Sequence, residues 1–344
     1  MTSVLIVDLG GTKSRVGLFE IQNDGEDCVF QRVYRNKEFT GIAEIIEAFH
    51  QQSPRRAKHL CIALAGVVEG DTATLTNLDW RIDMTSLQQR FFFEEVLFIN
   101  DLTALAAAVS QLDDDEVVVL KKGEVEKDEA VAIIAPGTGL GQGFLFAQGR
   151  NFLARGSEGG HAGFSPKNDE ELRFAAWVIE RSGAASAERV CAGPGITLLY
   201  RFFTENEGLE PAEWVRQRAS ESEDLAPLIV EGASSANPCP VCMKVINRYL
   251  AMLGSEAANL ALKLYARGGV YIGGGVILHL LAAVSLEPFV VAFGRNEKMA
   301  ELLAAIPVFV IKKEDAHLYG ALYYAAARLG LGRYSRKGAA ADGR

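Results

Sequence analysis

The sequence predicts an α/β protein of two lobes, built from duplicated domains of the βββαβαβα type with a cleft between the lobes. Strand patterns alternate with helical patterns along the chain, which is typical of this fold class. A strand, a Gly/Thr turn and a second strand occur at residues 3–21 and again at 131–146, about 125 residues apart. The length of 344 residues suits two domains. The repeated opening therefore indicates one copy of a duplicated domain in each half.

The first half reads as three strands followed by mixed helices and strands. Short apolar runs rich in β-branched residues predict strands, and apolar residues three and four apart predict helices. In chain order the predictions are strands at 3–9, 12–21 and 28–35, a helix at 41–51, a strand at 60–64, a hairpin over 72–82, a strand at 96–99 and a helix at 102–112. The acidic run at 113–116 predicts a solvated break at the border between the lobes.

The second half repeats the three strands and then becomes mostly helical. The predictions are strands at 131–134, 143–146 and 151–155, helices at 169–182, 194–206, 211–220 and 241–266, strands at 270–272 and 307–311, and a last helix at 316–329. Residues 334–344 are rich in Arg, Lys, Gly and Ala and predict a disordered tail.

Composition excludes several classes of protein. The formal net charge is −9, whereas a nucleic-acid-binding protein needs a basic surface, so we expect no nucleic-acid partner. No run of about 18 apolar residues indicates a membrane span, and the first residues lack the pattern of a secretion signal. The five cysteines are an odd, sparse set that is typical of reduced thiols. We therefore expect a cytoplasmic protein without a membrane partner.

The first candidate site follows the first predicted strand. Gly10 and Gly11 allow backbone N–H groups to approach a phosphate closely, and Thr12 adds a hydroxyl. Lys13 follows directly and adds a positive charge. Asp8, at the strand end, is placed to bind Mg²⁺ directly or through water. The alternative for this segment taken alone is a tight hairpin turn with solvated charges.

A second Gly/Thr turn, with Gly137, Thr138 and Gly139, repeats this chemistry in the other half. One such turn is a common hairpin, but a matched pair predicts two loops that hold a polyphosphate from two sides. A third glycine cluster, with Gly274 and Gly275, lies between a strand and a helix. Glycines there would let a flat ring such as adenine lie against the backbone, although helix–strand contacts also use glycine. No GxxxxGK[ST] motif is present, so the sequence excludes a P-loop.

Asn100 and Asp101 end a predicted strand and begin a predicted helix. Asp is a common helix N-cap, and capping is one interpretation of Asp101. The other is that Asp101 accepts the proton of a sugar hydroxyl while Asn100 binds a neighbouring hydroxyl. Phosphoryl transfer needs in-line positioning, a metal ion and a residue that orients the nucleophile. Both interpretations stay open, and they are compatible.

Glu158 and His161 are separated by two glycines, and Glu188 follows further along the chain. Carboxylates and imidazole form directional hydrogen bonds, which a polyol ligand requires. The alternatives for Glu158 and His161 are a surface loop or half of a metal site. The two glycines are unfavourable for a helix, and no second His/Cys cluster completes a metal site, so the polyol-binding and surface-loop interpretations stay open.

Cys239 and Cys242 form a lone Cys-x-x-Cys pair. In other contexts such a pair is half of a zinc site or a redox pair. No second pair and no nearby His pair accompany it, and no strand of the thioredoxin type precedes it. We therefore interpret the two cysteines as structural and expect no zinc.

Taken together, these motifs resemble the bacterial glucokinase family. The segments that carry the resemblance are 8–12 (DLGGT), 99–104 (INDLTA), 137–141 (GTGLG), 158–161 (EGGH), 187–189 (AER) with 193–195 (GPG), and 273–275 (GGG). They occur in the order and spacing of that family over residues 4–329, and those from Asn100 to Glu188 are the specific ones. The Gly/Thr turns alone resemble the wider superfamily of hexokinase, actin and Hsp70-type ATPases, which implies a ribonuclease-H-like, actin-like ATPase fold.

The resemblance implies ATP-dependent phosphorylation of D-glucose at the 6-hydroxyl to glucose 6-phosphate, the first step of glycolysis. It implies ATP with Mg²⁺ as co-substrate, no tightly bound cofactor, closure of the lobes around glucose, and a homodimer. It implies a small lobe of residues 1–111 plus 317–333 and a large lobe of residues 112–316. The implied catalytic base is Asp101, and the implied sugar-binding residues are Asn77, Asn100, Asp101, Glu158, His161 and Glu188. The implied ATP-binding residues are Asp8, Gly10, Gly11, Thr12, Lys13, Gly137, Thr138, Gly139, Gly274 and Gly275.

Two segments depart from the family pattern. Lys13 stands where these glucokinases usually have Asn, as in the related repressor, open-reading-frame and kinase family, whose Cys-rich zinc motif is absent here. The segment 65–68 (AGVV) lacks the usual proline. Two alternatives accompany glucokinase activity: a kinase for another hexose, such as fructose or mannose, and a non-catalytic sugar-sensing regulator. A regulator on this fold needs an added DNA-binding segment, and the only basic extension is the short tail.

Overall fold

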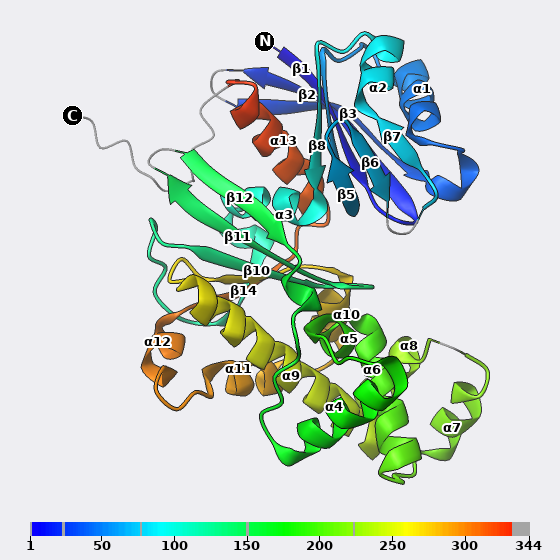
Figure 1. Cartoon of the computed structure of the whole chain (residues 1–344), viewed down its shortest axis with the longest axis vertical. Helices are drawn as coiled ribbons and strands as arrows, with labels where there is room; N and C mark the ends of the chain where they lie inside the picture. Colours follow the sequence, from blue (N-terminus) through cyan, green and yellow to red (C-terminus); the bar gives the residue numbers. More distant parts are fainter. Residues whose placement is uncertain (1, 23–24, 76–77, 149–150, 223, 332–344) are drawn as a thin grey trace. The chain divides into compact units, whose positions relative to one another are not determined.

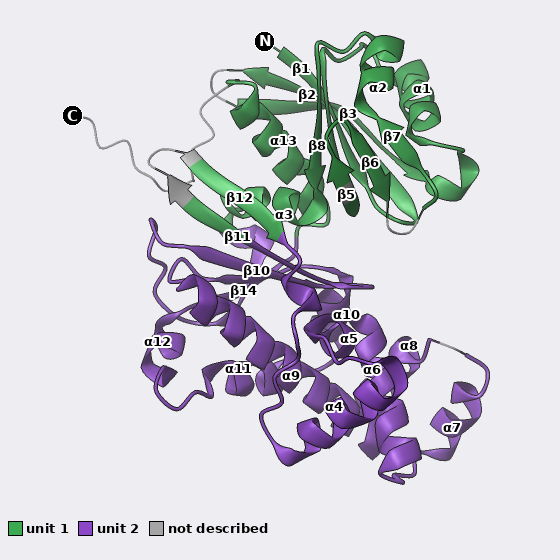
Figure 2. Ribbon diagram, in the orientation of Figure 1, with its two compact units in different colours: residues 1–113, 144–156, 313–344 green, residues 114–143, 157–312 purple. Residues whose placement is uncertain are grey.

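The computed structural model describes residues 2–22, 25–75, 78–148, 151–222 and 224–331. The chain forms two compact units (Figure 2). Unit 1 comprises residues 1–113, 144–156 and 313–344, and unit 2 comprises residues 114–143 and 157–312. Unlike the predicted small lobe, unit 1 therefore includes residues 144–156. The tail predicted at 334–344 lies outside the described residues.

Unit 1 is built on a five-stranded sheet in the order β3-β2-β1-β4-β8 (Figure 1). Its strands are β1 (Thr2–Leu9), β2 (Lys13–Gln22), β3 (Gly25–Arg35), β4 (His59–Leu64) and β8 (Glu95–Asn100). The first three form an antiparallel meander, whereas β4 runs parallel to β1 and β8 runs parallel to β4. A smaller sheet follows, made of β5 (Gly66–Glu69), β6 (Thr72–Leu75) and β7 (Arg81–Asp83). The carboxyl ends of β1 and β8 share one sheet edge, which is where α/β sheets usually bind ligands.

Helices cover both faces of the sheet of unit 1. They are α1 (Ile42–Gln52), α2 (Met84–Phe91), α3 (Asp101–Val109) and α13 (Ala316–Arg328). Leu5 and Val7 of β1 join one apolar core with α1 and α2, whereas Val4 and Ile6 join another with α3 and α13. Successive side chains of a strand point to opposite faces, so a strand covered on both faces is apolar at every position. This explains the continuous apolar run that predicts β1.

The second large sheet has the order β12-β11-β10-β13-β14-β9. Its strands are β9 (Val117–Lys121), β10 (Val131–Pro136), β11 (Leu140–Gln148), β12 (Asn151–Ser157), β13 (Val270–Ile272) and β14 (Val308–Ile311). The border between the units runs through β11 and β12. Apart from β9, the order repeats that of unit 1: three consecutive strands, then β13 parallel to the first of them and β14 parallel to β13. The repeat confirms the predicted duplication and the α/β class.

Unit 2 is mostly helical, and its longest helix is α9. The helices of unit 2 are α4 (Asp169–Ser182), α5 (Ala187–Cys191), α6 (Gly193–Arg201), α7 (Glu213–Ala219), α8 (Ala226–Ser234), α9 (Pro240–Leu264), α10 (Gly275–Ala283), α11 (Glu287–Gly294) and α12 (Ala300–Ala305). Helix α9 contacts α5, α6, α8, α11 and β10. Val245, Tyr249, Leu253 and Ala257, each four residues apart, are fully buried along it. This helix therefore supports several elements of unit 2 at once (Figure 1).

Most of the predicted elements are confirmed, with small shifts at their ends. The sequence does not predict β5, β9, α2, α5 and α8, nor the division of residues 275–305 into α10, α11 and α12. Short elements of this kind carry little periodicity, and tertiary contacts decide their conformation. No single helix among the described residues is long and apolar enough to cross a membrane, although α10 and α11, which meet at a 115° bend, pass that test as a pair by length and composition.

Candidate active site

The first predicted phosphate loop joins β1 to β2 in unit 1. Its turn is closed by Gly10 N–H, which donates to the Lys13 carbonyl at 3.1 Å. Asn36 holds the loop: its Nδ2 donates to the Gly10 carbonyl at 2.7 Å, and its backbone N–H donates to the Thr12 carbonyl at 2.9 Å. Asn36 is buried, whereas Thr12 and Lys13 are exposed. The loop is therefore fixed from one side and accessible to a ligand from the other.

Asn36 was not among the predicted residues. A lone Asn after a strand reads as an ordinary turn residue, so the sequence offered no signal for its role. The buried hydroxyl of Ser14 completes the support, because it donates to Asn36 Oδ1 at 2.7 Å. Of the residues that flank Ser14 in the sequence, Lys13 is exposed. Arg15 Nη1 donates to the Glu314 carbonyl at 2.6 Å.

Asp101 is the first residue of α3, and the helix is capped by its neighbour. Asn100 Oδ1 accepts hydrogen bonds from the backbone N–H groups of Leu102 at 2.9 Å and Thr103 at 3.3 Å. Asn100 is therefore the N-cap, and the capping interpretation of Asp101 is wrong. Asp101 Oδ1 also accepts from Leu102 N–H, at 2.9 Å. The side-chain amide NH₂ of Asn100 is the part that can still donate to a ligand.

The environment of Asp101 suits a base. Burial raises the pKa of its carboxyl above the ordinary value of 3.8, and the negative charge of Asp8 adds to the rise. His317 and the Leu102 N–H act in the opposite direction and lower that pKa. A buried carboxylate of raised pKa accepts a proton more readily than an exposed one. His317, at the start of α13, was not among the predicted residues.

In unit 2 the structure brings together three predicted sugar-binding residues. His161 Nε2 lies 3.5 Å from Glu158 Oε2, and His161 Nδ1 lies 3.6 Å from Glu188 Oε1. Glu158 and His161 come from the 3₁₀ turn Gly159–His161 and the residue before it, and Glu188 comes from α5. The side chains of Glu158 and His161 are 85% and 63% exposed. Two carboxylates and an imidazole thus present accessible acceptors and donors at one place.

The second phosphate loop lies beside this cluster. Gly137 N–H donates to the Gly139 carbonyl at 2.8 Å, which closes the turn between β10 and β11. The backbone N–H of Leu140, the residue after Gly139, donates to Glu188 Oε2 at 3.0 Å. The Gly137 carbonyl accepts from Gly193 N–H, at the start of α6, at 2.8 Å. Backbone hydrogen bonds therefore tie the loop both to Glu188 and to α6.

A cavity of about 1170 Å³ opens beside the second loop in unit 2. Gly137 and Thr138 line it, together with Gly193 at the start of α6 and Gly275 at the start of α10. Gly274 precedes α10 with a φ of +91°. Apolar side chains form much of the wall, namely Ile196, Leu198, Val230, Val276 and Leu280. Two helix N-termini beside apolar walls suit a ligand that has an anionic end and a flat apolar end.

Some residues of this cavity were not predicted. Arg189, Arg201 and His279 line it and add cationic or titratable groups. Each belongs to a helix whose face toward the cavity depends on tertiary contacts. A lone Arg or His in a helical sequence is more often solvated, so sequence patterns alone do not single out these three residues.

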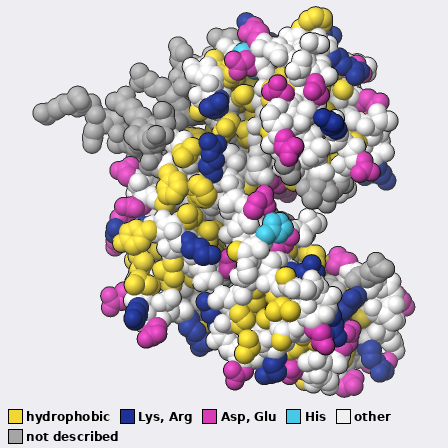
Figure 3. Space-filling model, viewed as in Figure 1, with side chains coloured by type: hydrophobic (Ala, Val, Ile, Leu, Met, Phe, Trp, Pro, Cys, Tyr) yellow, Lys and Arg dark blue, Asp and Glu magenta, His cyan; other side chains and the backbone are white. Residues whose placement is uncertain are grey.

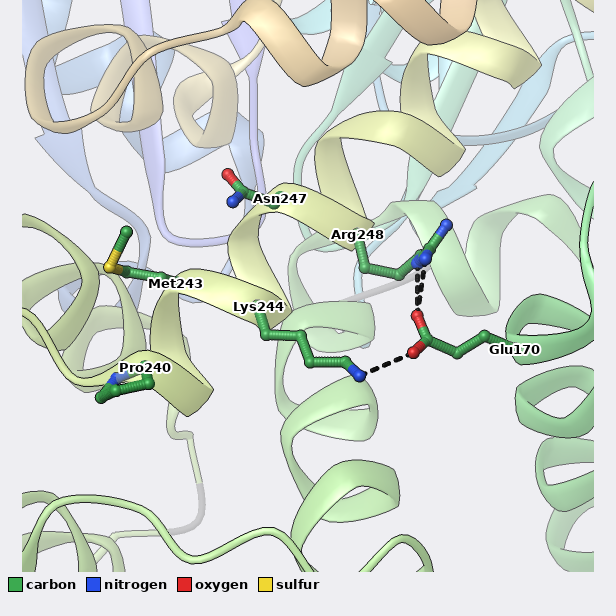
Figure 4. Close-up of a pocket in the computed structure, with 6 residues that line it drawn as sticks. All are labelled: Glu170, Pro240, Met243, Lys244, Asn247 and Arg248. Atoms are coloured by element: carbon green, nitrogen blue, oxygen red, sulfur yellow. Dashed lines mark hydrogen bonds and ion pairs between the residues drawn. The ribbon is translucent and has the colours of Figure 1, made fainter.

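A second cavity, of about 550 Å³, lies between α4 and α9 (Figure 4). Its charged groups form ion pairs. Glu170 lies 2.7 Å from Lys244 Nζ and 2.7 Å from Arg248, as the dashed lines in Figure 4 show. These cations lower the pKa of Glu170, although burial opposes them. Arg248 Nη1 also lies 3.1 Å from Glu171 Oε1, so two carboxylates offset the two cations and this cavity has little attraction for an anion.

Two predicted features fall outside the candidate site. Asn77 lies outside the described residues. Cys239 and Cys242 are buried at the start of α9, where Cys239 Sγ accepts from Ala212 N–H at 3.4 Å. Among the described residues, no group of three or more His, Cys, Asp or Glu side chains gathers to hold a metal ion.

Charged side chains of both signs are interspersed on one face of the molecule (Figure 3). On the face seen in Figure 3, Lys and Arg alternate with Asp and Glu over both units. The net charge of −9 agrees with this pattern. On this face (Figure 3) the described residues form no continuous basic stripe of the kind that binds a nucleic-acid backbone.

Comparisons with known proteins place the chain in a family. The glucokinase family model matches residues 5–328. The glucokinase of Nostoc sp. strain PCC 7120 is 33% identical over 345 residues, covering 95% of this chain and 99% of that protein. The solved glucokinase of an Antarctic psychrotroph has a TM-score of 0.79 at 26% identity, covering 94% of this chain and 98% of that chain. A Balamuthia mandrillaris glucokinase in complex with glucose has a TM-score of 0.76 at 23% identity, covering 94% of this chain and 93% of that chain.

These solved structures have the actin-like ATPase fold, which confirms the predicted fold class. The family match spans both units and all the motifs on which the resemblance was based. The chain belongs to the glucokinase family.

Proposed function

We propose that this chain transfers the terminal phosphoryl group of ATP to the 6-hydroxyl of D-glucose, with Asp101 as the catalytic base. As a member of the glucokinase family, the chain is an enzyme that phosphorylates glucose with ATP. The observation that best supports the residue assignment is the cluster of Glu158, His161 and Glu188 beside the second phosphate loop. An acceptor sugar and a phosphate donor need neighbouring sites, and this part of unit 2 offers both.

In the proposal the sugar is held by hydrogen bonds to its hydroxyls. Glu158 and Glu188 accept from two hydroxyls, and His161, between them, donates or accepts according to its tautomer. The amide NH₂ of Asn100 donates to another hydroxyl, because its carbonyl oxygen caps α3. Asn77 stays a predicted contact. A sugar that lacks one of these hydroxyls leaves polar groups unpaired, which is the physical basis for discrimination among hexoses.

Asp101 accepts the proton of the 6-hydroxyl as the oxygen attacks the terminal phosphorus. Its raised pKa supports this role, since a stronger base is a better proton acceptor at neutral pH. In-line positioning and charge stabilisation supply most of the rate enhancement of phosphoryl transfer, and the base orients the nucleophile.

The two Gly/Thr loops hold the phosphates in this proposal, and the 1170 Å³ cavity holds the adenosine. In unit 1 the phosphate oxygens accept hydrogen bonds from the backbone N–H groups of Gly10, Gly11 and Thr12. In unit 2 they accept from those of Gly137 and Thr138. Gly274 and Gly275 allow the flat base to approach the start of α10 closely. The apolar wall of the cavity excludes water from the base.

Mg²⁺ accompanies ATP in the proposal. Carboxylate oxygen is a preferred ligand of Mg²⁺, and the half-buried Asp8 at the end of β1 presents such oxygens directly or through water. Mg²⁺ is usually bound by one or two carboxylates together with phosphates and water, so a site with few protein ligands is suitable. When bound, the ion would neutralise part of the phosphate charge.

A cytoplasmic homodimer completes the proposal. All five cysteines, which lie within the described residues, are free thiols, and a reducing compartment favours free thiols. Light scattering on the purified chain tests the dimer, because a homodimer has twice the mass of 37.2 kDa. A monomeric mass at the concentration of the activity assay would contradict it.

Turnover across a panel of sugars tests the proposed function. We expect ATP-dependent phosphorylation with kcat/KM for D-glucose above that for D-fructose and D-mannose. A higher kcat/KM for another hexose would identify a different hexokinase, and failure to turn over any hexose would favour a sugar sensor. ADP and polyphosphate, offered in place of ATP, test the donor.

A further inference from the structure

The proposed sugar-binding residues of unit 2 lie in or next to helical elements that are too short to be stable on their own. His161 ends the three-residue 3₁₀ turn Gly159–His161, Glu158 directly precedes that turn, and Glu188 belongs to the five-residue α5. Helices of this length are unstable alone, so contacts from elsewhere must fix them. The direction of each carboxylate depends on those contacts.

A buried polar pair lies beneath the 3₁₀ turn. Gln142 of β11 and Glu256 of α9 are 2% and 4% exposed. Gln142 Nε2 donates to Glu256 Oε1 at 2.8 Å, and Glu256 Oε2 accepts from Asn259 Nδ2 at 3.1 Å. The recorded partners of the Glu256 carboxylate are thus two neutral amides. A buried carboxylate with such partners is costly to retain, which suggests a role beyond stability.

The turn rests directly on Gln142. A Cβ atom added to Gly159 would lie 2.2 Å from Gln142 Oε1, so the backbone of the turn lies against that oxygen. Ser157 Oγ donates to the Gln142 carbonyl at 3.4 Å and accepts from Gly159 N–H at 3.2 Å. The amide of Gln142 can point its oxygen toward Gly159 only while its nitrogen has an acceptor on the other side, and Glu256 is that acceptor.

The same helix also supports Glu188. Tyr249 of α9 is fully buried, and its hydroxyl donates to the Cys191 carbonyl at the end of α5, at 2.7 Å. The charge of Glu256 adds to burial in raising the pKa of the Cys191 thiol, which agrees with a carboxylate close to α5. One face of α9 therefore supports both elements that carry the sugar-binding residues.

We propose that Glu256 and Gln142 are positioning residues for the sugar: Glu256 orients the Gln142 amide, and Gln142 sets the position of the Glu158–His161 turn. This inference rests on the proposed role of Glu158 and His161. It predicts that changes to the pair act on glucose affinity, because they displace the turn, and leave the affinity for ATP nearly unchanged.

A double-mutant cycle on the full-length enzyme tests the proposal. Gln142→Glu places two carboxylates against each other, so we expect the KM for glucose to rise about tenfold or more, as misplacement of a binding group does. The swapped pair, Gln142→Glu with Glu256→Gln, restores a donor opposite an acceptor and leaves an oxygen beside Gly159. We expect the swap to bring the KM for glucose back to within about threefold of wild type, the non-additivity expected of residues in contact.

A matched control separates positioning from simple loss of stability. Glu171 of α4 is 3% exposed, and its Oε1 lies 3.1 Å from Arg248 Nη1. Glu171→Gln should lower the unfolding temperature and leave the KM for glucose unchanged. If Gln142→Glu lowers the unfolding temperature as Glu171→Gln does, and the KM for glucose stays at the wild-type value, the positioning role is wrong. A swap that restores stability without restoring the KM overturns it as well.

The outcome also distinguishes this inference from the proposed function. Wild-type enzyme that phosphorylates no hexose would overturn both. Wild-type enzyme that phosphorylates glucose, with Gln142→Glu variants of unaltered KM, would overturn only the positioning role.

Discussion

The carboxylate of Glu188 accepts a hydrogen bond from the backbone N–H of Leu140 at 3.0 Å. Leu140 is the first residue of β11 and directly follows the second phosphate loop, whereas the other carboxylate oxygen of Glu188 lies 3.6 Å from His161 Nδ1. One carboxylate thus joins the candidate ATP loop to the candidate sugar cluster within unit 2. A change at Glu188 should therefore affect both substrates.

Glu188→Ala is expected to raise the KM for glucose and the KM for ATP, each by about tenfold, because each side loses a hydrogen bond to a charged group. Glu188→Gln keeps an oxygen that can accept from Leu140 N–H, so we expect its KM for ATP to stay near wild type while its KM for glucose rises. Steady-state kinetics with each substrate varied in turn measures both. A Glu188→Ala enzyme with an unchanged KM for ATP would contradict the link.

Asp101→Asn is expected to lower kcat by about 10²–10⁴-fold, the usual contribution of a general base, and to change the KM for glucose only a few-fold. The same change should raise the unfolding temperature at pH 7. Burial raises the folded-state pKa of Asp101 above its ordinary value of 3.8, so stability is lost as the pH rises from that value through the folded pKa. Asn removes the buried charge. Wild-type kcat in this variant would exclude Asp101 as the base.

The pH profile of kcat/KM should have an acidic limb set by Asp101. A base acts only when deprotonated, so activity falls as the pH falls through the raised pKa of this carboxyl. The positive charge of His317 lowers that pKa, so His317→Gln should move the limb to higher pH. His59→Gln, at the other end of the sheet, is the control and should leave the limb in place. A limb that does not move in His317→Gln refutes the coupling.

Removal of divalent cations should abolish turnover without unfolding the protein. EDTA removes the Mg²⁺ that accompanies ATP, and added Mg²⁺ should restore full activity. The unfolding temperature should not change, because we interpret Cys239 and Cys242 as structural thiols rather than zinc ligands. Structural zinc contributes folding free energy outright, so a large fall in unfolding temperature with EDTA would contradict this interpretation.

Gly320→Ala should destabilise unit 1 and disturb Asp101. A Cβ at position 320 of α13 would lie 1.8 Å from the Ala104 carbonyl of α3, so the two helices would have to move apart. Overpacking of this kind costs about 1–3 kcal/mol. Because Asp101 begins α3, we also expect kcat to fall. Denaturant unfolding measures the first effect, and Gly25→Ala, at an exposed glycine where an added Cβ meets no atom within 4 Å, is the control.

Much of the fold follows from local patterns in the sequence. The apolar run of β1 and its Gly10–Gly11 turn predict the first hairpin, and the repeat of that pattern at Gly137–Gly139 predicts the duplication. Both are short-range signals, because strands and glycine turns depend on neighbouring residues. Helix α5 shows the limit: its five residues contain too little periodicity to be recognised, and contacts with α9 determine it.

The sequence by itself determined the types of residue available for the chemistry: two glycine loops, the Asn100–Asp101 pair, and Glu158, His161 and Glu188. Only the tertiary structure decided which of them meet and in what state. In the structure, Glu188 accepts a hydrogen bond from Leu140 N–H, and Asn100 rather than Asp101 caps α3. Gln142 donates a hydrogen bond to Glu256, which is 114 positions away in the sequence. The physical reason is that burial, charge–charge proximity and long-range hydrogen bonds depend on distances in space, and local residue patterns do not encode such distances.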